Sequence, residues 1–349
     1  MDATDWTAQY ERPLAGLLGV HVDERVDASA PWLVLHLHIA KSGGAARLKA
    51  ALDAVASLHL LTSGTDSSTQ KTRLWTRVLT SRMMTLPLRE SDPKIVRFTR
   101  FLHQSTPRTA VTVVLDWTGI KVETVACPLL REFFNKERPV GTPPLMVGLA
   151  LARCRLTAQA IEMLDAVLGD VKKAGSVGRL VDVHSLERID LSDNGLALKA
   201  LDALATLLDH HEVRDVRLEN VLALADSDGT VQAVASVLRS IFSPEANHRS
   251  PVRVSLANNS LDPRYYQVIA ESLAAASRPL RRLSLARTIS VYDSKRREGC
   301  WQWLAGVLFT SEPTMENCPG PVACELDLSG NPLYADDLIC FEQRVQASH

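Results

Sequence analysis

One pattern of aliphatic residues recurs along the chain and limits what it can fold into. Leucine or a similar residue stands at the first, fourth and sixth positions, asparagine at the ninth and leucine at the eleventh. The clearest copies are LERIDLSDNGL with Asn194, VRVSLANNSL with Asn259 and CELDLSGNPL with Asn331. A fourth copy, MVGLALARCRL, carries Cys154 in place of asparagine. Such self-similarity indicates a chain built from stacked units.

Weaker copies of the pattern fill the intervals between the clear ones. They keep the apolar positions and lose the asparagine, whose place is taken by threonine or valine in three of them. They comprise Ala110, Val113 and Leu115 with Thr118; Val213, Val216 and Leu218 with Val221; Leu280, Leu283 and Leu285 with Thr288; Trp32, Leu35 and Leu37; and Met83, Leu86 and Leu88.

The pattern has a physical explanation. In Leu-x-Leu, alternate side chains of a short strand point to the same side, so both leucines enter a core. The asparagine, cysteine or threonine three residues later is expected to turn inward and hydrogen-bond backbone groups of adjoining turns. Between the strands the apolar spacing becomes helical, as in Ile161, Leu164 and Leu168. Thr157 stands where the cap of that helix is expected.

These motifs resemble the leucine-rich repeats of ribonuclease-inhibitor-like proteins. The resemblance implies an α/β fold, a right-handed α/β horseshoe with short parallel strands on the concave side and helices on the convex side. We expect an amino-terminal cap or lead-in over 1–30, degenerate repeats over 31–109, leucine-rich repeats over 110–334 and a capping helix over 335–349.

The order of the motifs is most similar to the leucine-rich-repeat domain of the CARMIL family, the regulators of actin capping protein. Over residues 110–290 a cysteine-type repeat, VGLALARCRL, precedes an asparagine-type repeat, SLERIDLSDNG, and a stretched repeat ending in SPVRVSLANNSL. The resemblance implies a scaffold in a cytoskeletal setting. It assigns capping-protein binding to no residue of this chain.

Composition and charge indicate which partners and which cellular location to expect. Charged residues make up 23% of the 349 residues and nearly cancel, at a net charge of −1, so no bulk attraction to nucleic acid or anionic membrane is expected. The first 30 residues are acidic and lack the basic and apolar regions of a signal peptide, and no apolar run is long enough to span a bilayer. Six irregularly spaced cysteines do not form a disulfide framework. A cytoplasmic or cytoskeletal location is expected.

Motifs for metal or catalytic chemistry are weak. His36 and His38 share a strand face without a third ligand, and the cysteines from Cys300 to Cys340 are too widely spaced for a zinc site. Asp226-Ser-Asp-Gly229 resembles half of a calcium loop, but its twelfth position is Val237. No nucleophile is tied to a histidine by spacing. The sequence predicts no catalytic residues, no metal and no cofactor.

The residues most informative about function are the charged ones that flank the inward leucines. On neighbouring strands they would form a ladder of arginines interrupted by acids, on the concave face. Arginine is enriched at protein interfaces because its planar guanidinium pairs with carboxylates. Trp117 is expected on or near the rim of that face, as a contact residue or as a packed one. The predicted partner-binding residues are Arg188, Asp190, Arg214, Arg217, Arg253, Arg281, Arg282, Arg287 and Trp117.

Three functions follow from this ladder. The leading hypothesis is a non-catalytic scaffold whose concave face holds an acidic or mixed-charge protein. The alternatives are a structural subunit embedded in a large cytoskeletal, axonemal or ribonucleoprotein assembly, and RNA binding through the arginines. The ladder also has a simpler interpretation, a solvated face whose arginines and acids neutralise one another.

Overall fold

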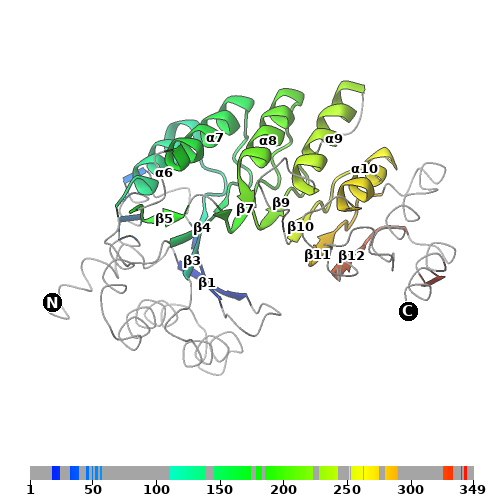
Figure 1. Cartoon of the computed structure of the whole chain (residues 1–349), viewed down its shortest axis with the longest axis horizontal. Helices are drawn as coiled ribbons and strands as arrows, with labels where there is room; N and C mark the ends of the chain where they lie inside the picture. Colours follow the sequence, from blue (N-terminus) through cyan, green and yellow to red (C-terminus); the bar gives the residue numbers. More distant parts are fainter. Residues whose placement is uncertain are drawn as a thin grey trace. The chain divides into compact units, whose positions relative to one another are not determined.

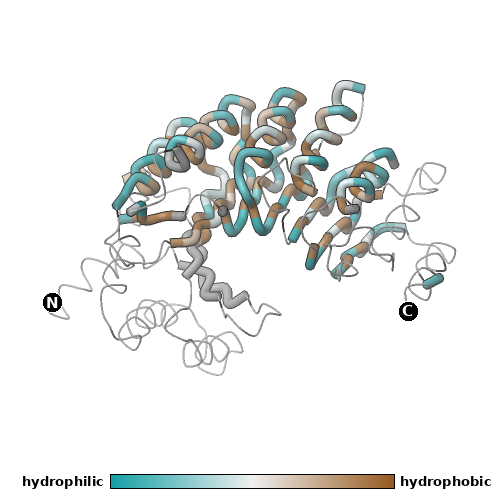
Figure 2. Tube along the Cα trace, in the orientation of Figure 1, coloured by the Kyte–Doolittle hydropathy of each residue, from teal (hydrophilic) through white to brown (hydrophobic). Residues whose placement is uncertain are grey.

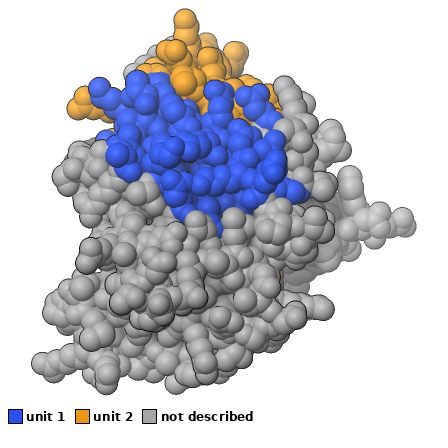
Figure 3. All heavy atoms as spheres, turned by 90° about the vertical axis from the view of Figure 1, so that its left-hand side faces the viewer, with its two compact units in different colours: residues 1–150, 170–187 blue, residues 151–169, 188–349 orange. Residues whose placement is uncertain are grey.

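The computed structural model describes a mixed helix and sheet fold with mainly parallel strands, as the sequence predicts for the α/β class. The described residues are 18–23 and 32–38 (backbone only), 45–46, 49, 52–53, 56, 111–137, 145–173, 178–182, 185–222, 228–242, 251, 253–261, 263–274, 280–289, 325–332, 339 and 342–343. The chain divides into two compact units (Figure 3): unit 1, residues 1–150 and 170–187, and unit 2, residues 151–169 and 188–349.

Unit 1 contains a sheet whose strands are parallel except for the first pair. β1 (Leu18–Asp23) runs antiparallel to β2 (Trp32–His38), and β2, β3 (Val111–Asp116), β4 (Leu145–Ala150) and β5 (Val181–Asp182) follow in parallel. The short strand β6 (Ser185–Leu186) also belongs to this unit. After β3 the chain forms a π-helical turn, η3 (Val122–Ala126), and α6 (Cys127–Phe134).

The described residues between 45 and 56 are helical. Leu52 and Ala56 are buried, whereas Lys49 is exposed and lies 2.6 Å from Glu132 of α6. One turn on, Asp53 pairs with Lys136 just beyond the end of α6. The segment is therefore amphipathic, and its charged side forms ion pairs with Glu132 of α6 and with Lys136 just beyond it.

The register of β3 corrects the sequence analysis. The repeat was aligned with Val113 and Leu115 as its inward pair, but Leu115 lies opposite Leu149, two residues later than that alignment requires. Trp117 therefore occupies the second inward position. Its backbone N–H donates to the Ala150 carbonyl at 2.8 Å, and its side chain is fully buried. The sequence pattern does not predict this register, because its inward positions are defined by aliphatic residues and one of them is a tryptophan here.

Unit 2 alternates strands with helices. Its elements are most of α7 (Ala158–Lys173), β7 (Arg188–Asp190), α8 (Leu198–His210), β8 (Glu212–Val213), β9 (Asp215–Arg217), α9 (Asp228–Phe242), β10 (Arg253–Ser255), α10 (Pro263–Ala274), β11 (Arg282–Ser284) and β12 (Glu325–Asp327). β7, β9, β10, β11 and β12 lie side by side in that order, all parallel (Figure 1). From β7 to β11, consecutive strands of this sheet are thus joined through helices, as parallel pairing requires.

The helices of unit 2 cover one face of this sheet. α8 packs against α9 and α9 against α10, and the three lie in a row in Figure 1. Their buried sides follow the predicted spacing, for example Leu201, Leu204 and Leu208 of α8. The alternation of hydrophobic and hydrophilic positions is visible along the strands in Figure 2. The Thr157 hydroxyl accepts a hydrogen bond from the Ala160 N–H at 3.0 Å, confirming the predicted cap of α7.

Six turns of unit 2, the first of them after β4 and the others after β7, β9, β10, β11 and β12, have the same backbone conformation. Just before each asparagine-type position stands a residue with positive φ, a region that non-glycine residues rarely adopt. The six residues are Arg153 (56°), Asp193 (58°), Asn220 (53°), Asn258 (59°), Arg287 (53°) and Gly330 (71°). Recurrence at one position of successive turns means that the turns are structurally equivalent, including those whose sequence match is weak.

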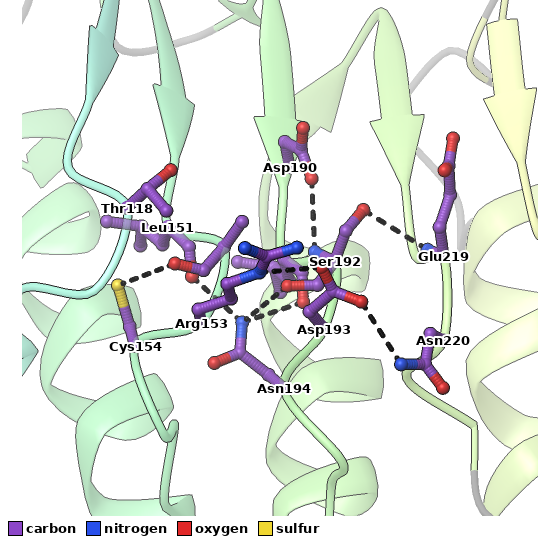
Figure 4. A network of polar contacts seen from close by, with 12 residues as sticks. Thr118, Leu151, Arg153, Cys154, Asp190, Ser192, Asp193, Asn194, Glu219 and Asn220 are labelled. Carbon is purple, nitrogen blue, oxygen red and sulfur yellow. Dashed lines mark hydrogen bonds and ion pairs between the residues drawn. The ribbon is translucent and has the colours of Figure 1, made fainter. Parts of the chain in front are cut away.

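Inward asparagines join consecutive turns, as predicted. The Asn259 amide donates to the carbonyls of Leu218 and Leu256, both at 2.7 Å, and its oxygen accepts from two backbone N–H groups at 2.8 Å. Asn194 (Figure 4) and Asn331 repeat this arrangement. The Cys154 thiol donates to the Ala152 carbonyl at 3.5 Å, and the Thr288 hydroxyl to that of Leu285 at 2.7 Å.

Several predicted features lie outside the described residues. They are the Met83–Leu88 copy of the pattern, the side chains of His36 and His38, and the cysteines from Cys300 to Cys340. Of the predicted carboxy-terminal helix only Ile339, Glu342 and Gln343 are described, and they are helical. Within the described part of the chain, no helix is both long and apolar enough to cross a lipid bilayer.

Candidate interaction surface

The face of the unit 2 sheet opposite the helices carries charged and polar side chains. Burial alternates along β7 and β10: Ile189 and Val254 point inward and are buried, while their neighbours point outward and are partly exposed. We call the outward set the charged face. It comprises Arg188, Asp190, Asp215, Arg217, Arg253, Ser255, Arg282, Ser284, Glu325 and Asp327.

Strand register arranges these side chains in two rows. In the first row Asp215 lies opposite Arg253, Arg253 opposite Arg282, and Arg282 opposite Glu325. The second row continues from Asp190 through Arg217, Ser255 and Ser284 to Asp327. Because neighbouring strands lie about 4.8 Å apart, each side chain is in direct reach of its row neighbours.

The β7–β9 end of the charged face forms a closed ion-pair cluster. A carboxylate oxygen of Asp215 lies 2.8 Å from the Arg188 guanidinium, and Arg217 approaches the same carboxylate at 3.4 Å. Asp215, expected to be exposed, is 4% accessible. Burial would lower the pKa of Arg217, but Asp215, Asp190 and Glu219 outweigh it and raise that pKa. At this end the arginines neutralise their own neighbours, as the simpler interpretation of the ladder anticipated.

Two serines form hydrogen bonds to acidic side chains of neighbouring strands or turns. The Ser255 hydroxyl donates to Glu219 at 2.7 Å, and the Ser284 hydroxyl donates to Asp327 at 2.9 Å. The backbone N–H and hydroxyl of Ser329, together with Ser284, hold the pKa of Asp327 below its ordinary value. The second row is therefore largely satisfied within the protein.

The remaining predicted contact residues differ in accessibility. Arg281, Arg282 and Arg287 are exposed, and Arg214 and Arg253 are partly exposed. Arg282 lies 3.7 Å from Glu325, and its side chain is 52% accessible. Trp117 is different: it belongs to unit 1 and is fully buried, so its assignment as a partner contact is corrected to a core residue.

One polar cluster was not anticipated. Asp165 of α7 accepts from the Nε2 atom of His211 at 2.8 Å and lies 3.0 Å from Nδ1 of His210, at the end of α8. Desolvation opposes ionisation of Asp165, but the two histidines outweigh it and lower its pKa. The consecutive histidines were visible in the sequence. Their partner, 45 residues earlier, was not.

Reactive groups are few among the described residues. Burial, aided by Glu123, raises the pKa of the Cys127 thiol to about 11, which leaves it protonated and unreactive at neutral pH. No group of three or more histidine, cysteine or acidic side chains within the described ranges has a geometry suited to a metal ion.

Comparison with known proteins adds no identification. The chain matches no protein-family model, and a search of curated proteins finds no match to it.

Proposed function

We propose that this chain is a leucine-rich-repeat solenoid, a right-handed α/β horseshoe, that acts as a non-catalytic protein-binding scaffold. The recurring sequence motif supports this, as do the parallel strands of unit 2, the equivalent turns and the inward asparagines. Stacked units of this kind bury a continuous core and leave an extended face for partners.

The observation that carries the proposal is the charged face itself. Parallel sheets are ordinarily covered on both sides. Among the described residues of unit 2, helices cover one face of the sheet, while Arg282 and Glu325 are exposed on the other. A rigid sheet face that presents aligned arginines is suited to a protein partner of acidic or mixed charge.

The cellular setting is also part of the proposal. The order of cysteine-type and asparagine-type repeats resembles the CARMIL family, which favours an intracellular, cytoskeleton-associated scaffold. The stability of the native complex at high salt distinguishes the embedded-subunit alternative from the scaffold.

The proposal is tested by affinity purification or proximity labelling from the native cell. The full chain and the triple variant Arg217→Glu, Arg253→Glu, Arg282→Glu are compared for the proteins they retain. Loss of one specific partner by the triple variant is expected. The matched control is Arg239→Glu, an exposed arginine on α9 on the helical side.

Circular dichroism must show that the triple variant is folded, because Arg217 contacts the buried Asp215. If a folded triple variant retains every partner of the unaltered chain, the charged face is not the binding surface.

A further inference from the structure

A row of turn residues in unit 2 runs just beyond the carboxyl ends of the strands. Its members are the turn residues with positive φ, and we call it the turn row: Arg153, Asp193, Asn220, Asn258, Arg287 and Gly330. The backbone N–H of each of the first five donates to the carbonyl just before the next member, for example Asn258 to Ala286 at 2.8 Å. The members therefore lie in register on neighbouring turns, about 4.8 Å apart.

The first half of the turn row holds a carboxylate. Asp193 accepts a hydrogen bond from the Asn220 amide at 3.1 Å and another from Nε of Arg153 at 3.0 Å (Figure 4). These two donors hold the pKa of Asp193 below its ordinary value. All three residues are exposed. An asparagine and an arginine of this row thus bind a carboxylate at the surface of the protein.

The second half of the turn row presents the same two kinds of donor without a carboxylate. Asn258 and Arg287 are adjacent members of the row, and both are exposed. Within the described part of unit 2, neither the Asn258 amide nor the Arg287 guanidinium forms a hydrogen bond or an ion pair. Their N–H groups are therefore available to an anion.

The side chain of Arg287 lies against the last member of the row. A Cβ atom built at Gly330 would lie 2.6 Å from Cγ and 3.1 Å from Nε of Arg287, so this side chain runs directly over the glycine. The positive φ of Arg287 (53°) also sets the direction in which the side chain leaves the backbone. A side chain that is restricted in this way before binding loses less conformational entropy when a partner arrives.

We infer that Asn258 and Arg287 form a binding site for the carboxylate of an aspartate or glutamate side chain of a partner protein. One carboxylate oxygen accepts from the Asn258 amide and the other from the Arg287 guanidinium, as Asp193 accepts from its two donors. The inference rests on the proposed scaffold function, and it extends the surface that contacts the partner from the charged face to the turn row.

The charge of the site fits one carboxylate better than a nucleic acid. Arg287 supplies one positive charge, and its neighbours in the row, Asn258 and Gly330, are neutral. The other arginine of the row, Arg153, already lies 3.0 Å from Asp193. A nucleic acid carries a phosphate on every nucleotide and is bound through several cations, which the turn row does not supply.

The test follows the two side chains directly, because a single carboxylate binds weakly. In the full-length protein, the Asn258 Nδ2–H and Arg287 Nε–H signals are recorded by heteronuclear NMR at low salt. The probe is an acetylated and amidated Gly-Ser peptide with one central glutamate. Both signals are expected to shift with the same dissociation constant. The same peptide with glutamine is expected to shift neither signal, and oligouridylate is expected to bind more weakly than the glutamate peptide.

Two variants probe the site from its two sides. Arg287→Gln is expected to weaken glutamate-peptide binding, read at Asn258, about tenfold, because a hydrogen bond to a charged group is lost. With Asn258→Asp the row supplies its own carboxylate to Arg287, so binding read at Arg287 is expected to be lost. Asparagine and aspartate both tolerate positive φ, which preserves the turn. Arg153→Gln is the matched control and should leave binding unchanged.

Equal shifts with the glutamate and glutamine peptides would overturn the inference, as would unchanged binding by Arg287→Gln or tighter binding of oligouridylate. These results leave the scaffold proposal standing, because that proposal is tested by the partners that the triple variant of the charged face retains. Conversely, loss of a partner by the triple variant, together with no shift at Asn258 and Arg287, supports the charged face and rejects the site on the turn row.

Discussion

At the scale of single residues, the described structure depends on side chains that satisfy buried backbone groups. Asn259 is 1% accessible and forms four hydrogen bonds of normal length to the backbone of two turns. Thr288 and Cys154 each donate to a carbonyl near their own turn. These substitutes share with asparagine a small size and a group that can donate, which explains why the sequence tolerates them at that position.

Replacing Asn259 by alanine should therefore be costly. It leaves two backbone carbonyls and two N–H groups without their partner, so we expect a loss of at least about 2 kcal/mol in the free energy of unfolding. Asn331→Ala should cost less, because Asn331 is only partly buried. Urea denaturation measures both against the exposed control Gln232→Ala. A value for Asn259→Ala no larger than this control would contradict the role given to the asparagines.

Gly330 is the one glycine in the row of positive-φ turn residues of unit 2. A Cβ atom built there would lie 2.6 Å from Cγ of Arg287. Gly330→Ala combines backbone strain with this overlap, and we expect about 1–2 kcal/mol of destabilisation. Adding Arg287→Ala should restore the part due to the overlap, and thermal denaturation of the double-mutant cycle measures it. Gly195, with no atom within 4 Å of its Cβ position, supplies the control Gly195→Ala. No restoration would mean that strain alone is responsible.

At the scale of elements, pairs of strands and helices are tied together by a few charged groups. On the sheet, Arg188 of β7 and Arg217 of β9 enclose Asp215. Between helices, Asp165 of α7 holds both histidines at the end of α8. Both clusters join segments that are distant in sequence, and each contains a largely buried member, Asp215 or His211.

The Asp215 cluster predicts different roles for arginines that look alike in the sequence. Arg188→Ala leaves a buried carboxylate with one longer contact, and a loss of about 3 kcal/mol is expected. Arg253→Ala, on the partly exposed neighbouring strand, should change the free energy of unfolding by less than about 1 kcal/mol. Guanidinium chloride denaturation compares them. Equal losses would show that Arg188 is not structural in the sense argued.

The Asp165 cluster predicts a pH dependence. The pKa of Asp165 is lowered in the folded state, so its contribution to stability is present above the ordinary value of 3.8 and is lost as the pH falls through the lowered value. Asp165→Asn should therefore be less stable near neutral pH and lose less stability than the unaltered chain below pH 3.8. Thermal unfolding between pH 6 and pH 2.5 measures this, with the exposed Asp202→Asn on α8 as control. Parallel pH profiles would refute the assignment.

At the scale of the whole molecule, the nearly balanced net charge conceals a local separation. The β7–β9 end of the charged face is neutralised internally, whereas the side chains of Arg282 and Glu325 at the β11–β12 end are exposed. An interaction based on such exposed charges is screened by salt, since the Debye length falls from about 8 Å at physiological ionic strength to about 3 Å at 1 M.

A reversible scaffold should therefore release its partner as sodium chloride is raised to 1 M. Sedimentation or size-exclusion chromatography of the native complex at the two salt concentrations measures this. The purified chain should remain monomeric in both. Co-fractionation with one large particle at 1 M salt would instead support a subunit embedded in an assembly.

The sequence alone was enough to predict the alternation of strands and helices in unit 2, the inward asparagines and the helical cap at Thr157. These depend on spacings of a few residues, which side-chain direction and local hydrogen bonding determine. It also identified the arginines of the charged face. It did not show which of them are neutralised, because Arg188 and Asp215 meet through sheet pairing 27 positions apart.

The position of Trp117 also could not be predicted from the local sequence. Its neighbours in sequence resemble a repeat whether the inward pair is Val113 and Leu115 or Leu115 and Trp117, and only pairing with β4 selects the second register. The charge on each row of the sheet is likewise the sum of side chains brought together from five strands. Local pattern thus specifies the unit of the fold. Which charges are buried, paired or left facing one another depends on the neighbours that folding supplies, because electrostatic energy is set by distance and solvent exposure rather than by sequence separation.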